Sequence, residues 1–315
     1  MLARVANNLF WMGRYIERCE HVARYLSVNY FSSLDAPNEF SQSRQFVLRS
    51  LLFMVGDVPE DSDAILDEHE VLYDIGLNPE KEYAIINCVK IARENANSAR
   101  DLISSSVYES LNTFYHFIIN YSVEDYKKKA LYDFTTNCIE HAVILKAKIK
   151  TTLLHDEIFS IIRLGINIER SMQVIRIINA KYNDILLINN HQNNNYDSKL
   201  EWSTLLKCVE SYDMMRRFYK KVPKSKNTLD FLILNQICPR SIVNSLGEVS
   251  HHIKALSTEK KFFKNSSIFL VNKIYTEYKY KYIEEIEVDF QTFIEDILEK
   301  LVAISKQVEE EYFNY

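Results

Sequence analysis

A segment near the start of the chain places charged residues at helical intervals within an otherwise apolar stretch. It covers residues 8–26 and reads NLFWMGRYIERCEHVARYL. When it is projected as a helix, at about 100° per residue, one broad stripe is apolar, which is typical of a face turned to a core. An adjoining stripe carries Gly13, Glu17, Glu20 and Arg24. Since no side of this helix is fully polar, we expect its charges to be partly buried, where each needs a partner.

The same pattern returns 152 residues later. Aligning Gly13 with Gly165 over residues 10–26 gives six identities in seventeen positions, namely Gly13/Gly165, Ile16/Ile168, Glu17/Glu169, Arg18/Arg170, Val22/Val174 and Arg24/Arg176. The apolar stripe keeps its phase in the copy, whereas Arg14 and Glu20 become Ile166 and Met172. We therefore predict an internal duplication, in which the copy helices at residues 8–29 and 156–180 pack against each other.

The composition favours helices over strands. Among 315 residues there are only five glycines and five prolines, which leaves few turn residues for an all-β or α/β fold. Apolar residues recur at helical steps over residues 80–112, 202–219 and 268–312, and no segment has a clear strand pattern. We predict an all-α helical bundle with essentially no β-structure. It would form one domain over residues 1–315, with related halves at roughly 1–150 and 151–315.

Charge and hydropathy exclude several classes of function. The net charge of -5 gives no electrostatic footprint for nucleic acid. The absence of an uncharged apolar run of about 18 residues predicts that no segment spans a membrane. The N-terminus lacks the apolar core of a signal peptide, so we expect a cytoplasmic protein. No glycine-rich phosphate loop is present, and only Glu248 and His251 form the Glu-x-x-His unit that a di-metal bundle needs twice, so we expect no metal and no cofactor.

Arginines and glutamates form the candidate site. We expect one polar region, inside or at the mouth of the bundle, to contain Arg14, Glu17, Arg18, Arg93, Arg100, Glu169, Arg170 and Arg240. Two interpretations stay open. The set is either a structural ion-pair network between helices or a pocket in which arginines hold a carboxylate or phosphate. In the pocket, Glu17 or Glu169 is the candidate catalytic base, and the ligand-binding residues are Arg14, Arg18, Arg93, Arg100, Arg170 and Arg240.

The opening of the chain, MLARVANNLFWMGRYIER, resembles that of the bacterial alpha-E domain family, a domain of unknown function. Further blocks of resemblance follow in family order and span essentially the whole chain: residues 92–96 with Arg100 and Asp101, residues 164–170, and residues 231–235 with Pro239, Arg240 and Ser241. The sequence departs from the family pattern at Asn97 and Ile166, where Arg is usual, and at Cys238, where an aromatic residue is typical. The first two departures argue against a cationic role at positions 97 and 166.

The resemblance implies a helical fold and a setting. Alpha-E proteins are typically encoded beside, or fused to, ATP-grasp-like and transglutaminase-like proteins. Because this chain has no nucleotide loop, activation of a carboxylate would fall to such a partner. We therefore expect an accessory or substrate-presenting component of an ATP-dependent amide- or peptide-bond-forming system, whose Arg-rich pocket holds an anionic peptide or acyl group. Two alternatives stay open: an acyl or peptidyl transferase with Glu17 or Glu169 as base, and a purely structural helical adaptor.

Overall fold

The computed structural model describes residues 3–35, 40, 43–61, 64–127, 131–191, 198–256 and 263–313; residues 1 and 2, which open the quoted resemblance, lie outside this range. The first half of the chain contributes α1 (Ala3–Ser32), α3 (Arg44–Val55), α4 (Glu68–Gly76), α5 (Ile85–Ser98), α6 (Ser105–Ile119), α7 (Val123–Lys127) and α8 (Leu131–Thr152). The second half contributes α9 (Glu157–His191), α10 (Lys199–Cys208), α11 (Tyr212–Tyr219), α12 (Ser225–Ile233), α13 (Ile242–Leu256), α14 (Ser267–Lys279), α15 (Ile283–Glu287) and α16 (Phe290–Tyr312). Two short 3-10 helices, Ser33–Asp35 and Arg100–Leu102, complete the regular structure of the described residues, which contain no strand. The predicted all-α class is confirmed.

Three of the predicted helices are interrupted. Residues 80–112 contain α5 and the start of α6, and Ser104 caps α6 by accepting a hydrogen bond from a backbone N–H at 3.1 Å. Residues 268–312 divide into α14, α15 and α16, and Asp289 caps the last of these in the same way at 3.2 Å. Residues 202–219 divide into α10 and α11. The apolar period continues across each break, so periodicity alone predicted longer helices.

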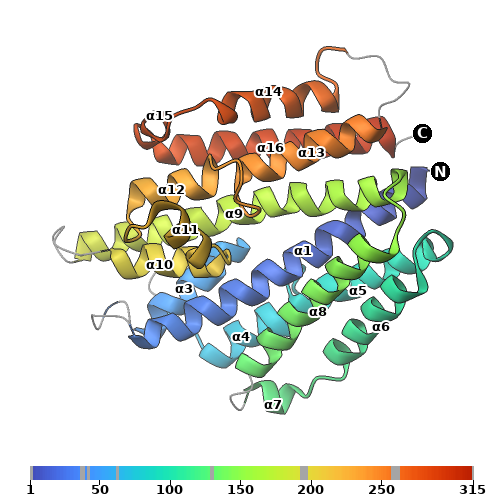
Figure 1. The fold of residues 1–315 in the computed structure, drawn as a ribbon. Coiled ribbons are helices and arrows are strands. Elements are labelled where there is room, and N and C mark those ends of the chain that lie inside the picture. The colour runs from blue at the N-terminus through green and yellow to red at the C-terminus, as the bar shows by residue number, and fades with distance from the viewer. Residues whose placement is uncertain are drawn as a thin grey trace.

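The long helices α1 and α9 lie side by side at the centre of the bundle and run in the same direction (Figure 1). A Cβ added to Gly13 would lie 2.5 Å from the backbone oxygen of Ile162, and one added to Gly165 would overlap the backbone oxygen of Phe10. Glycine at both positions therefore lets the two backbones approach. The predicted packing of the copy helices against each other is confirmed.

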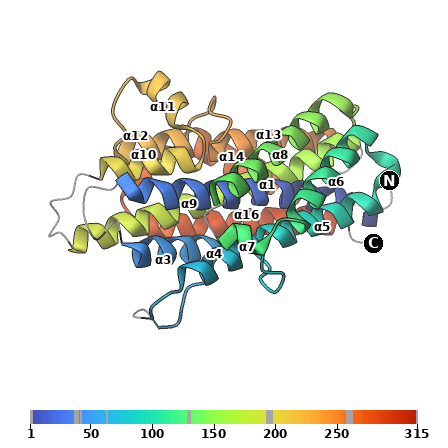
Figure 2. The ribbon, with the colours of Figure 1, turned by 90° about the horizontal axis from the view of Figure 1, so that it is seen from below.

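Equivalent helices surround the two central helices. In the first half, α1 packs against α5 and α8, and α6 packs on both of these; in the second half, α9, α13, α16 and α14 repeat those contacts. A five-residue helix, α7 or α15, precedes the last helix of each half. Seen from below in Figure 2, α3, α4 and α5 lie along one side of the central pair, and α10, α12 and α13 lie along the other.

The buried faces of α8 and α16 match residue by residue. The buried apolar positions Leu131, Phe134, Cys138, Ala142, Leu145 and Ile149 recur 159 residues later as Phe290, Phe293, Ile297, Leu301, Ile304 and Val308. Buried apolar side chains from Ala6 to Phe313 belong to one continuous cluster that draws on both halves. The domain boundaries inferred from the sequence stay a prediction. None of the helices within the described ranges is long and apolar enough to cross a membrane.

Candidate functional site

The duplicated Glu-Arg pairs exchange partners across the α1–α9 interface. Arg170 Nε of α9 donates to Glu17 Oε1 of α1 at 2.6 Å, and Arg18 Nε of α1 donates to Glu169 Oε1 of α9 at 2.6 Å. Both carboxylates are fully buried. Each helix thus supplies one carboxylate and one guanidinium group, so the duplication produces two reciprocal ion pairs.

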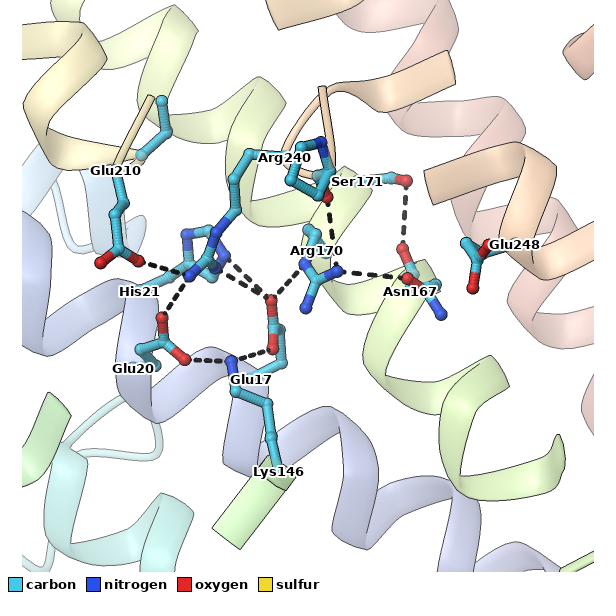
Figure 3. Close-up of polar contacts among 12 residues, drawn as sticks. Glu17, Glu20, His21, Lys146, Asn167, Arg170, Ser171, Glu210, Arg240 and Glu248 are labelled. Atoms are coloured by element: carbon cyan, nitrogen blue, oxygen red, sulfur yellow. Dashed lines mark hydrogen bonds and ion pairs between the residues drawn. The ribbon is translucent and has the colours of Figure 1, made fainter. Parts of the chain in front are cut away.

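A first group of charges surrounds Glu17 and Glu20 (Figure 3). This Glu17 cluster consists of Glu17, Glu20, His21, Lys146, Arg170, Glu210 and Arg240, all labelled in the figure, together with Arg24, which pairs with Glu20 and Glu210. Lys146 Nζ of α8 donates to Glu17 Oε2 at 2.8 Å and also to Glu20. Arg240, in the turn before α13, donates to Glu20 Oε1 at 2.8 Å and to Glu210 Oε2 at 2.6 Å. The cluster therefore joins α1, α8 and α9 to the turns after α10 and before α13.

The cations hold the two buried carboxyl groups of this cluster ionised. Burial by itself would raise the pKa of Glu17, but Arg170 and Lys146 lower it well below its usual range. Burial opposes ionisation of Glu20 in the same way, and Lys146 and Arg240 lower its pKa far below the ordinary value. His21 Nε2 lies 3.2 Å from Glu17 Oε1, and burial lowers the His21 pKa, which favours the neutral imidazole.

A second group, the Glu169 cluster, consists of Glu169, Arg14, Arg18 and Gln173. Arg14 Nε donates to Glu169 Oε2 at 2.8 Å, Arg18 Nη2 donates to the same oxygen at 3.1 Å, and Gln173 Nε2 donates to Glu169 Oε1 at 2.8 Å. Burial would raise the Glu169 pKa, but Arg18 and Arg14 lower it far below its ordinary value. Gln173 occupies the repeat position of His21 and makes the equivalent contact with its own motif glutamate.

Six of the eight predicted site residues gather around the α1–α9 interface, divided between these two clusters. Arg93 and Arg100 do not join them, which corrects the prediction of a single shared region. Arg93 Nε donates to Asn112 Oδ1 at 2.8 Å, and its guanidinium group lies 4.4 Å from the centre of the Tyr115 ring. Arg100 lies 4.1 Å from the centre of the Tyr108 ring. Since the buried face of α5 is turned toward α1, Arg93 lies beside that face and contacts α6 instead, and Arg100, in the 3-10 helix after α5, also contacts α6. The ligand-binding role of both arginines stays a prediction.

Two lysines that pair with buried carboxylates were not predicted from the sequence, the half-buried Lys146 and the buried Lys181. Lys146 directly follows Leu145, which belongs to the buried apolar stripe of α8. A charged residue next to that stripe is the sequence feature that could have indicated a buried ion pair. Lys181 of α9 is fully buried, donates to Asp184 Oδ2 at 2.6 Å, and lies 3.3 Å from Glu201 Oε2. It also donates to Asn29 Oδ1 at 2.7 Å, and these two residues occupy equivalent positions in the 152-residue repeat.

The described residues contain no group of three or more His, Cys, Asp or Glu side chains placed to hold a metal ion. What the arrangement offers chemically is paired charge, in which guanidinium and ammonium groups hold carboxylates.

Comparison with known proteins gives one match. A family model described as a predicted alpha-helical domain with a conserved ER motif matches residues 1–313. The dipeptides Glu17-Arg18 and Glu169-Arg170 are the two Glu-Arg sequences in the chain, and they form the reciprocal ion pairs described above. Neither a curated protein nor a protein of solved structure matches the chain.

Proposed function

Because this chain belongs to the Alpha-E family, and because its motif glutamates are occupied in ion pairs between helices, we propose that it is a non-catalytic, substrate-presenting component of an ATP-grasp-linked system that forms amide or peptide bonds. An ATP-grasp-like protein activates the carboxylate in this proposal, and a transglutaminase-like protein is a second partner. The chain itself holds an anionic peptide or acyl group, in the cytoplasm of a bacterium.

The observation that carries this proposal is the state of Glu17 and Glu169. Both carboxylates are fully buried, and each contacts at least two cations. Both also have a pKa far below the usual range. A general base works best with a pKa near the working pH and must reach the proton that it removes. A buried, ionised and fully paired carboxylate meets neither condition, which favours presentation over catalysis by these residues.

An excess of cations supports an anionic ligand. In the Glu17 cluster, the four cations Arg24, Lys146, Arg170 and Arg240 face the three carboxylates Glu17, Glu20 and Glu210. In the Glu169 cluster, Arg14 and Arg18 face a single carboxylate. Guanidinium groups in such surroundings bind carboxylates and phosphates through charge-assisted hydrogen bonds.

The proposal can be tested by reconstitution with an ATP-grasp-like protein from the same genome. We expect ATP-dependent amide product to require this chain. Glu17→Gln should lower the rate of product formation only in proportion to the folded protein that is lost. Thermal melting in the assay buffer measures that loss. Glu284→Gln is the matched control, because Glu284 forms an exposed ion pair with Lys226.

The other outcomes separate the alternatives. A fall in kcat of about 100-fold or more for Glu17→Gln, with folding and partner binding intact, would assign it the role of base and favour the transferase. Product formation that does not require this chain would contradict both the substrate-presenting role and the transferase role. The structural adaptor would then be the remaining alternative.

A further inference from the structure

Arg24 and Arg176 occupy the same position in the two copies, but their surroundings differ. Arg24 Nη2 lies 3.1 Å from Glu20 Oε1 and 2.9 Å from Glu210 Oε2, and its side chain is 12% exposed. Arg176 is exposed, and it makes no hydrogen bond or ion pair with the part of the chain that the structure describes. The first copy therefore neutralises this arginine, and the second does not.

One cause is the residue at the Glu20 position. The repeat places Met172 there, and the thioether of Met172 contacts Arg14 Nη2 at 3.2 Å instead of presenting a carboxylate to Arg176.

The other cause lies where α3 and α10 end. Gly56 and Glu210 both follow these helices with positive φ angles, 84° and 53°. In both turns the next residue donates a backbone hydrogen bond to a carbonyl five residues earlier, from Asp57 to Leu52 at 3.0 Å and from Ser211 to Leu206 at 2.7 Å. Gly56 is thus the structural counterpart of Glu210, so the second carboxylate is also missing beside Arg176.

The missing carboxylates leave a cleft of about 190 Å³ next to the Glu169 cluster. Its polar lining consists of Arg18, Arg176, Gln173, Tyr83 and Glu82, and the end of α3 with Met54 and Val55 closes one side. Arg18 donates to Glu169 through Nε and Nη2, which leaves Nη1 for another acceptor. Glu82 is exposed, and the hydroxyl of Tyr83 donates to Asp57 at 2.5 Å.

The charge in this region is unbalanced. Arg14, Arg18 and Arg176 lie near one buried carboxylate, Glu169, and the cleft lining adds one exposed carboxylate, Glu82, so three cations face two carboxylates. Arg176 keeps contact with solvent, but the surrounding protein displaces part of its water, and this partial desolvation lowers its pKa; repulsion from Arg18 and Arg14 adds to the effect, while attraction to Glu169 opposes it. The attraction of the arginines to an anion in the cleft would offset this repulsion.

We infer that the cleft is a binding site for a carboxylate, held by Arg18 and Arg176. In the first copy, the carboxylates of Glu20 and Glu210 bind Arg24. An external carboxylate would bind Arg176 in the second copy in the same way. A volume of 190 Å³ equals that of about six water molecules. The ligand is therefore a small carboxylic acid or the carboxyl end of a peptide. This inference rests on the proposed function in that it names the site for its anionic ligand, but its test is separate, because binding can be measured on this chain without an ATP-grasp-like partner.

The test is a titration of the full chain with N-acetylalanine, with N-acetylalaninamide as the neutral probe of matched shape, followed by NMR or calorimetry. We expect the acid to bind saturably with a dissociation constant in the millimolar range, more weakly at high salt, and the amide not to bind. Arg176→Gln should weaken binding about tenfold or more. Gly56→Glu should do the same, because it supplies the counterpart of the Glu210 carboxylate while Arg176 remains. Arg216→Gln, which changes an exposed arginine on α11, should leave binding unchanged.

Equal binding of the acid and the amide would overturn the inference, and so would an unchanged dissociation constant in Arg176→Gln. Inorganic phosphate that binds more tightly than the acid would overturn the assignment to carboxylates. If glutamate at the positive φ of position 56 prevents folding, Arg176→Gln decides the question alone.

Discussion

Among the residues that the structure describes, Glu169 is the single carboxylate paired with Arg14 and Arg18 between α1 and α9. Glu169→Gln keeps the shape of the side chain but leaves two largely buried guanidinium groups without a counter-charge. Removing one partner of a buried ion pair costs about 3–5 kcal/mol, so we expect the free energy of unfolding to fall by about that amount. Urea denaturation measures it, with the exposed carboxylate variant Glu284→Gln as the control that changes little. A loss below about 1 kcal/mol for Glu169→Gln would mean that the pairs do not hold the helices together.

Buried titratable groups make stability depend on pH. Burial, with a contribution from Arg163, lowers the pKa of His252 to about 4. Between about pH 6.5 and 4 the unfolded chain binds a proton that the folded chain does not, so stability falls as the pH falls through this range. The lowered pKa values of Glu17 and Glu169 give stability that is present above about pH 4.5 and lost below it.

The histidine contribution can be isolated by substitution. We expect urea denaturation to show a decrease of up to about 2 kcal/mol between pH 7 and pH 5, once solvent screening is allowed for. His252→Gln should reduce this decrease, and His21 and His141, whose pKa values burial also lowers, contribute to the remainder. An unchanged pH dependence in His252→Gln would contradict this assignment.

At the scale of elements, the contact between α1 and α9 depends on two glycines. A Cβ at position 13 or 165 would meet a backbone carbonyl of the other helix, and backbone cannot move aside as a side chain can. Alanine favours a helix over glycine by about 1 kcal/mol, but overpacking outweighs that gain, so we expect Gly13→Ala and Gly165→Ala to destabilise the protein by about 2 kcal/mol or more. Denaturation of each variant measures the effect.

Gly247→Ala is the control for both glycines. Its added Cβ would lie 3.2 Å from a ring carbon of Tyr275, and this side chain can shift. We expect a neutral or stabilising effect there. If all three alanine variants behave alike, the two central helices are not in backbone contact.

The sequence predicted the central element and its partner because duplication preserved both the glycines and the apolar phase. It predicted the helix ends poorly, because caps such as Ser104 and Asp289 are ordinary polar residues that leave the apolar period unbroken. The site was predicted in part for a related reason. The reciprocal exchange between motif pairs follows from duplication, whereas the position of Lys146 depends on how α8 packs against α1. The prediction that Arg93 joins the shared polar region was wrong because a step of one residue along α5 changes the direction of the side chain, so that Arg93 faces α6 and not α1.

At the scale of the molecule, two similar halves share one core. The parallel helices α1 and α9 form the contact between the halves, and each half places its other helices around its own central helix in the same order. The paired charges of the Glu17 cluster also draw on both halves. Where the halves differ, at Glu20 and Met172 or at Glu210 and Gly56, one copy fills a space with carboxylates that the other leaves open. Divergence after duplication thus produced the carboxylate cleft within a symmetrical framework.

This shared core predicts that the halves unfold together. Trp11 of α1 reports on the first half and Trp202 of α10 on the second, so Trp11→Phe and Trp202→Phe each leave one tryptophan, whose emission is excited selectively over that of the tyrosines. In urea, we expect the fluorescence transition of each variant to coincide with its helix signal in circular dichroism, as a single cooperative transition requires. The comparison is made within each variant, because each substitution changes stability by itself; Trp11, for example, loses its contact with Arg14 at 4.4 Å. A fluorescence midpoint that departs from the helix midpoint in either variant would show that one half unfolds before the other.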